Sequence, residues 1–166
     1  MKKVILIGTS HTIQLGDGKK DSFYSYVEQL CRTHKVKAIA EEINTEQSVA
    51  KNVSISLGIR HKIIEPTPNE LEGLGIEKVH EIEYQLMSLY DIDEWPENPE
   101  AEVNRELASR IQDTYRKREL EWLKRINELD IWPVLIICGA NHYEPFYKLL
   151  VSSGIDVVKE ESKWGL

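Results

Sequence analysis

The stretch Val4-Ile5-Leu6-Ile7-Gly8-Thr9-Ser10-His11 decides the fold, because four apolar residues in a row are followed by a glycine at which the chain can turn. An apolar run without polar alternation is typical of a parallel strand that is covered on both faces. The same order of features returns in Val134-Leu135-Ile136-Ile137-Cys138 and the following Gly139-Ala140-Asn141-His142. Both segments therefore predict a buried strand that ends in a turn and a histidine.

Three further short apolar runs, at residues 36–40, 62–64 and 155–158, also predict strands. Helical patterns lie at about residues 21–34, 46–57, 79–90 and 98–128, and Pro145 is expected in the first turn of a last helix that ends near residue 152. Strands that alternate with helices are joined by right-handed crossovers. The sequence thus predicts an α/β fold of three layers with a mainly parallel central sheet of about five strands.

The length of 166 residues is that of one domain, and we expect residues 1–166 to share a single core. Between about residues 66 and 99, prolines, glycines and acidic residues interrupt every long periodicity. No repeat or low-complexity linker separates two cores in this region. The segment is therefore predicted to be an insertion or lid within the domain.

The charge and the cysteine content limit the kinds of partner and compartment that the sequence suggests. The chain has 21 lysines and arginines against 28 aspartates and glutamates, a net charge of −7, so it has no electrostatic reason to bind nucleic acid or an anionic membrane. Cys31 and Cys138 lie far apart in apolar surroundings, which predicts reduced, buried thiols. The apolar run at the N-terminus is too short for a signal peptide, and no segment approaches membrane-spanning length. We expect a soluble cytoplasmic protein with a small-molecule or peptide substrate, and the oligomeric state stays open.

Candidate site residues follow the predicted strands. His11 comes after the first strand, Glu41 and Glu42 after the second, and His142 after the fourth. Because the carboxyl ends of parallel strands meet at one edge of a sheet, we expect both histidines and one of the glutamates to converge there. A third Gly-x-x-His spacing ends at His61, but it enters a strand and is expected at the opposite edge. His34, His61 and His80 are interpreted as ordinary surface or loop residues.

Two imidazoles and a carboxylate are ligands that suit zinc or a related divalent ion. His11, His142 and one of the two glutamates, Glu41 or Glu42, would hold the metal (Mn, Co or Zn), which would activate a water molecule. The other glutamate of the pair could act as general base or hold a ligand histidine. A metal-free reading stays open, in which a histidine polarised by a glutamate activates water directly. Arg118 is the candidate for orienting an anionic group or stabilising an oxyanion.

Each candidate also has a purely structural reading. His11 could be a loop histidine that bonds only backbone, and His142 could be a helix-entry residue with Asn141 as the cap. The two glutamates could be solvated acids near a helix N-terminus. Arg118 could lie on the solvated face of a charged helix that carries ion pairs such as Glu121 with Arg125.

Together these motifs resemble the TraB/Tiki superfamily, which includes pheromone-shutdown proteins, Tiki proteases, erythromycin esterases and ChaN-like haem-binding proteins. The resemblance rests on two Gly-x-x-His motifs at Gly8–His11 and Gly139–His142, an acid at Glu41 or Glu42, and the arginine at Arg118. It includes the sequence Phe146-x-x-Leu149-Leu150-x-x-x-Gly154 after the second motif. It covers about half of the chain, mainly its two ends, and residues 45–100 take no part in it.

The resemblance implies a metal-dependent hydrolase, peptidase- or esterase-like, with its site at one edge of the sheet. It assigns His11 and His142 to the metal, Glu41 to the metal or the chemistry, Glu42 and Arg118 to the chemistry, and Gly8 and Gly139 to the turns that hold the cofactor. Unlike the Tiki proteases, the chain is expected to lack a membrane segment and a secretion signal. The alternative function is a non-catalytic binding module of the same fold that holds haem, a small anion or a protein partner.

Overall fold

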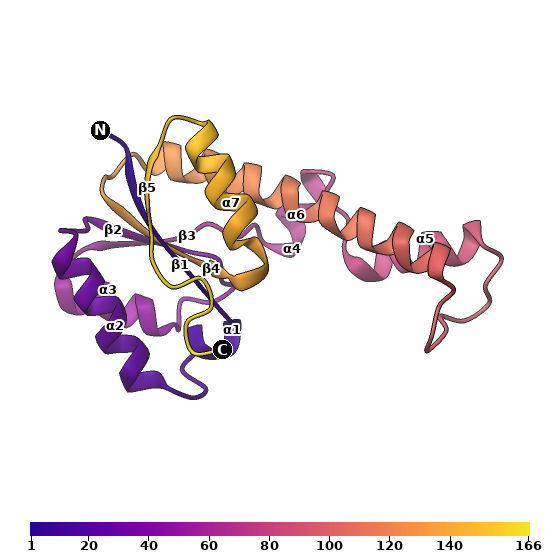
Figure 1. Cartoon of the computed structure of the whole chain (residues 1–166), viewed down its shortest axis with the longest axis horizontal. Helices are drawn as coiled ribbons and strands as arrows, with labels where there is room; N and C mark the ends of the chain where they lie inside the picture. The colour runs from indigo at the N-terminus through magenta and orange to yellow at the C-terminus, as the bar shows by residue number, and fades with distance from the viewer. The chain divides into compact units, whose positions relative to one another are not determined.

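A computed structural model describes residues 1–166 and contains a sheet of five parallel strands (Figure 1). The strands are β1 (Lys3–Thr9), β2 (Ala38–Glu41), β3 (Arg60–Ile63), β4 (Val134–Gly139) and β5 (Asp156–Lys159), in the order β3-β2-β4-β1-β5. The predicted α/β fold with a parallel sheet is confirmed, and each predicted strand end lies within two residues of the observed one.

Seven helices connect or flank the strands: α1 (His11–Gln14), α2 (Lys20–Thr33), α3 (Val49–Leu57), α4 (Pro68–Gly73), α5 (Val79–Leu89), α6 (Ala101–Leu129) and α7 (Ala140–Ser152). The short helices α1 and α4 were not expected. Helix α4 begins with a capping box, in which the Thr67 hydroxyl accepts the Glu70 N–H and the Glu70 carboxylate accepts the Thr67 N–H.

The entry into α7 differs from the prediction in two respects. The helix begins at Ala140, so Pro145 lies inside it and not in its first turn. Gly139 is the N-cap residue, and Asn141 is already helical, so the prediction that Asn141 caps the helix was wrong. Proline lacks the N–H that would bond the carbonyl oxygen four residues earlier, and the helix accommodates this loss near its start. His142 is therefore held by regular helix from its first turn.

Alternation along the buried strands sends successive side chains to two helical layers. Val4 and Leu6 belong to a cluster with Trp122 of α6 and Phe146 of α7. Ile5 and Ile7 belong to a second cluster with Phe23 of α2, among others. Because both faces of the central strands are fully covered by apolar side chains, the sheet is the middle layer of three.

The chain divides into two compact units. The first contains residues 1–65 and 119–166, and thus the whole sheet; the second contains residues 66–118, with α4, α5 and the first part of α6. Within the second unit, Ile82, Leu86 and Val103 are buried, and Arg110 donates to the side-chain oxygen of Gln85. The second unit begins where the sequence predicts an insertion and extends beyond residue 99, the predicted end. No helix combines the length and the apolar character needed to cross a membrane.

Candidate functional site

Glu42 lies at the centre of the candidate site, at the carboxyl end of β2. One carboxylate oxygen, Oε1, accepts the backbone N–H of Gly139 at 2.7 Å, and the other, Oε2, lies 3.3 Å from Nε2 of His11. The backbone N–H of Glu42 donates to the Ile137 carbonyl oxygen of β4. The carboxylate therefore joins the segment after β1 to the segment after β4.

His11 is the exposed member of the His11–Glu42 pair. It is the first residue of α1, which the Ser10 side chain caps by accepting the Ile13 N–H. The His11 side chain is 52% exposed, whereas that of Glu42 is only 3% exposed. The geometry is therefore an accessible imidazole held by a buried carboxylate, and the interpretation of His11 as a loop histidine that bonds only backbone was wrong.

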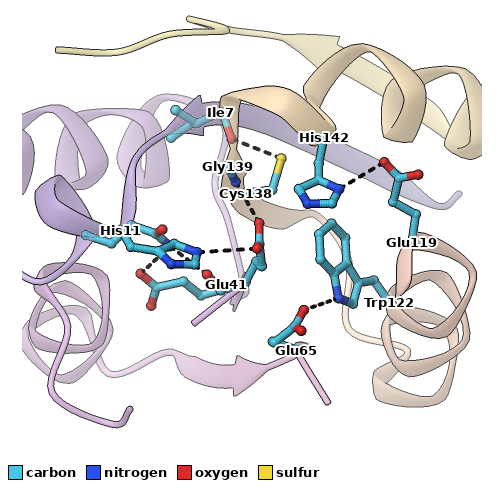
Figure 2. A network of polar contacts seen from close by, with 11 residues as sticks. Ile7, His11, Glu41, Glu65, Glu119, Trp122, Cys138, Gly139 and His142 are labelled. Atoms are coloured by element: carbon cyan, nitrogen blue, oxygen red, sulfur yellow. Dashed lines mark hydrogen bonds and ion pairs between the residues drawn. The ribbon is translucent and has the colours of Figure 1, made fainter. Parts of the chain in front are cut away.

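Gly139 connects this pair to His142. A methyl group on Gly139 would lie 3.3 Å from Glu42 Oε1 and 3.7 Å from His142 Cδ2. Both side chains thus approach the same point above the end of β4, and in Figure 2 Gly139 and Cys138 lie between the two histidine rings. Of the predicted set, the structure brings Glu42 to His11 and to Gly139, whereas the convergence of both imidazoles with one glutamate in a common site stays a prediction.

His142 has a second, separate carboxylate partner. Its Nδ1 lies 3.2 Å from Oε1 of Glu119 in α6, and the residue is only 4% exposed. The Trp122 ring meets the imidazole edge-on with centroids 4.8 Å apart, and its indole N–H donates to Glu65 Oε2 at 2.8 Å (Figure 2). Sequence reasoning missed Glu119 and Glu65. The spacing of Glu119 and Trp122, three residues apart on a helix, is a signal that could have placed both on one face of α6.

Glu41 points to the opposite face of the sheet from Glu42 and has partners of its own. Its carboxylate accepts from Ser48 Oγ at 2.6 Å and from Gln14 Nε2 at 3.1 Å, and it lies 2.8 Å from His61 Nε2. Both side chains of the Glu41–His61 pair are buried, at 0% and 1% exposed. The interpretation of His61 as an ordinary surface or loop residue was wrong, because its imidazole reaches diagonally from β3 to the end of β2.

The first motif glycine is fixed by the C-terminal segment. A methyl group on Gly8 would lie 2.1 Å from the Ser162 carbonyl oxygen. The Gly8 N–H donates to the Glu161 carbonyl, and the Trp164 N–H donates to the Gly8 carbonyl. Trp164 stacks on Tyr26 with ring centroids 5.5 Å apart. The packing of residues 160–166 thus accounts for the glycine at this position, whereas its assignment to cofactor binding stays a prediction.

Cys138, the last apolar residue of β4, is fully buried beside the two carboxylates. Burial first, and then the negative charges of Glu42 and Glu119, raise the pKa of the Cys138 thiol well above its usual value. Its S–H points to the Ile7 carbonyl oxygen at 3.8 Å. The thiol is therefore a neutral part of the core.

The predicted metal ligands do not fit a metal ion as they stand. No group of three or more histidine, cysteine, aspartate or glutamate side chains is arranged to hold one. His11 and His142 each face a different carboxylate, and Glu41 is enclosed by its own buried partners.

Arg118 is the last residue of the second unit and immediately precedes Glu119. Its guanidinium lies 5.7 Å from the centre of the Tyr115 ring. The expected ion pair between Glu121 and Arg125 is confirmed, with 3.1 Å between Oε1 and Nε. The predicted role of Arg118 in the chemistry stays a prediction.

Compared with known protein families, curated proteins and solved structures, the chain matches none of them. The resemblance to the TraB/Tiki superfamily therefore stays a prediction. The function has to be argued from the side chains at the edge of the sheet.

Proposed function

We propose that this protein is a cytoplasmic hydrolase of esters or amides in which His11, oriented by Glu42, is the general base. The observation that carries the proposal is the contact of the half-exposed His11 imidazole with a carboxylate that is itself buried and bonded to the Gly139 N–H. A base oriented by a second group, itself fixed by a third, is the recurring arrangement for activating a nucleophile. The free, buried cysteines support the cytoplasmic assignment.

The chemistry follows from the tautomer of His11. With the Glu42 carboxylate accepting at Nε2, that nitrogen carries the proton, and the basic lone pair lies on Nδ1. Nδ1 takes a proton from water, the oxygen of that water bonds to the carbonyl carbon, and the carbonyl oxygen becomes negative. When the carbon–oxygen or carbon–nitrogen bond to the leaving group breaks, the leaving group takes the proton back from the imidazolium. Glu42 stabilises the imidazolium between the two steps.

His142, in the N-terminal turn of α7, is proposed as a second polar group of the same site, with its imidazole held by Glu119. It can donate or accept a proton close to the point where Glu42 meets Gly139. Arg118 keeps its predicted role as the cation that orients the substrate or stabilises the oxyanion. The resemblance to esterases and proteases supports ester and amide substrates.

The proposal is tested by hydrolysis of p-nitrophenyl acetate, a panel of peptide amides and a panel of phosphoesters. His11→Gln is expected to lower kcat/KM by at least about 100-fold, which is the usual contribution of a general base. His80→Gln is the matched control, because it makes the same change at an exposed histidine that has no proposed role. Equal rates for wild type and His11→Gln, or no turnover of any substrate, would reject the proposal. A Soret band on addition of haemin in the absence of turnover would then favour the binding module.

A further inference from the structure

We propose that Gln14 is a positioning residue for His11: its side-chain amide ties helix α1 to the end of β2 and holds His11 against Glu42. The inference rests on the proposed function only in naming His11 as the base. Gln14 is completely buried, and it was not singled out by any motif of the sequence.

The amide nitrogen of Gln14 makes two hydrogen bonds. It donates to Oε1 of Glu41 at 3.1 Å and to the backbone carbonyl oxygen of Glu42 at 3.1 Å. Both partners are acceptors, so the opposite orientation of the amide would place its oxygen against two other oxygens. The chemistry therefore fixes which way the amide lies.

The Glu41 carboxylate is a rigid acceptor for this tie. Besides the Gln14 amide, the carboxylate accepts a hydrogen bond from the Ser48 hydroxyl at 2.6 Å, and its Oε2 lies 2.8 Å from Nε2 of His61. Ser48 is also the N-cap of α3, where its oxygen accepts the Lys51 N–H. The carboxylate is thereby connected to α3 and β3, and Gln14 connects α1 to all of them.

Helix α1 depends on such a tie because it is a single turn of four residues. His11 is its first residue and Gln14 its last, so both belong to one short rigid segment. The helix has few backbone hydrogen bonds of its own, such as that from the Gln14 N–H to the Ser10 carbonyl. A short helix of this kind is set in place by its side chains, and the amide of Gln14 is the buried one that reaches β2.

The Gln14 amide is bonded through its nitrogen and not through its oxygen. The Gln14 Oε1 atom and the His61 Nδ1 atom are both buried and receive no hydrogen bond from the protein. An apolar side chain of similar shape would remove the unbonded Gln14 oxygen, but it would also take the donor away from Glu41 Oε1 and from the Glu42 carbonyl oxygen. The directional tie to β2 is what the amide adds.

The test compares Gln14→Met, which keeps the length of the side chain and removes both hydrogen bonds, with Glu42→Gln. The first readout is the position of the His11 imidazole ¹⁵N–¹H correlation at one fixed pH. Gln14→Met is expected to displace this signal in the same direction as Glu42→Gln, by at least half as much. The second readout is kinetic: kcat is expected to fall at least about tenfold with KM nearly unchanged.

Val53→Ala is the matched control, because Val53 is completely buried in α3 and the change lowers stability without touching the site. It is expected to leave the His11 signal in place. If Gln14→Met does not fold, Glu41→Gln weakens the same tie from the other side and is expected to displace the His11 signal in the same direction. An unmoved His11 signal in whichever of the two variants folds would overturn the inference.

The spectroscopic readout needs no substrate, so the two proposals fail separately. If wild type hydrolyses nothing while Gln14→Met displaces the His11 signal, the proposed function is wrong and the positioning role stands. If wild type is active and Gln14→Met changes neither the signal nor kcat, only the positioning role is wrong.

Discussion

Replacing Gly8 with alanine tests how the first motif is built. The added methyl group would lie 2.1 Å from the Ser162 carbonyl oxygen and 2.8 Å from its carbonyl carbon. Both atoms are backbone, so no side chain can turn away, and the C-terminal segment has to move. The displaced segment would give up the Gly8–Glu161 and Trp164–Gly8 backbone hydrogen bonds and the bond from Thr9 Oγ1 to the Trp164 carbonyl, each at 2.8 Å.

Three hydrogen bonds at about 1 kcal/mol each give an expected loss of about 3 kcal/mol in the free energy of unfolding. Overpacking of the unmoved structure would cost a similar amount. For a chain of this size, such a loss lowers Tm by roughly 6–12 °C. Urea unfolding followed by circular dichroism measures the free energy, and scanning calorimetry measures Tm.

Gly73→Ala is the control for Gly8→Ala, because nothing lies within 4 Å of the position of its added methyl group. It is expected to leave the free energy of unfolding unchanged within about 1 kcal/mol. Partial proteolysis of Gly8→Ala is expected to cut first within residues 160–166. If Gly8→Ala is as stable as Gly73→Ala, the C-terminal segment does not hold the first motif and the reasoning is refuted.

Three other predictions concern the metal, the thiols and the buried tryptophan. ZnCl₂, MnCl₂ and CoCl₂ are expected to leave Tm unchanged, because only a ligand that binds the native state raises Tm and the predicted ligands do not fit a metal ion. A rise in Tm that disappears in both His11→Gln and His142→Gln would restore the metal-dependent hydrolase. Burial, with a smaller effect of Glu28, raises the pKa of Cys31 from 9.0 to about 12. The Cys31 thiol therefore stays neutral in the folded state, and it should lower the free energy of unfolding by at most about 1.4 kcal/mol per pH unit above about pH 9, in addition to the effect of Cys138. A Cys31→Ala variant with the same slope as wild type between pH 9 and 11 in urea titrations would contradict this. Trp122→Phe removes the hydrogen bond to the buried Glu65 carboxylate and is expected to lower the free energy of unfolding by about 1–3 kcal/mol, whereas an unshifted urea midpoint would count against that bond.

The sheet could be predicted because its central strands are apolar on both faces. Val4–Ile7 and Val134–Cys138 are completely buried, and such runs have few alternatives in a chain of this composition. Helix α1 was missed because one turn of four residues has no periodicity to detect. Helix α4 carried a usable signal in the Thr67–Glu70 capping box.

The sequence could predict where the candidate site lies, at the carboxyl ends of the strands, but not which side chains contact one another there. Alternation along β2 separates the two glutamates onto opposite faces of the sheet. Ile39 faces the layer of α2 and α3, and Glu41 follows it on that face. Glu42 therefore faces the other layer. The pairing of His142 with Glu119 depends on where α6 crosses the sheet, which no local pattern contains. The burial of His61 depends in the same way on the neighbouring strand.

A double-mutant cycle on His11 and Glu42 tests the central claim most directly. The variants His11→Gln, Glu42→Gln and the double variant are compared with wild type by kcat/KM on the best substrate of the panel. If Glu42 acts through His11, the double variant should be no slower than the slower single variant, within about threefold, because residues that act as a unit are not additive. Losses that multiply in the double variant, or an unchanged rate in Glu42→Gln, would contradict the account.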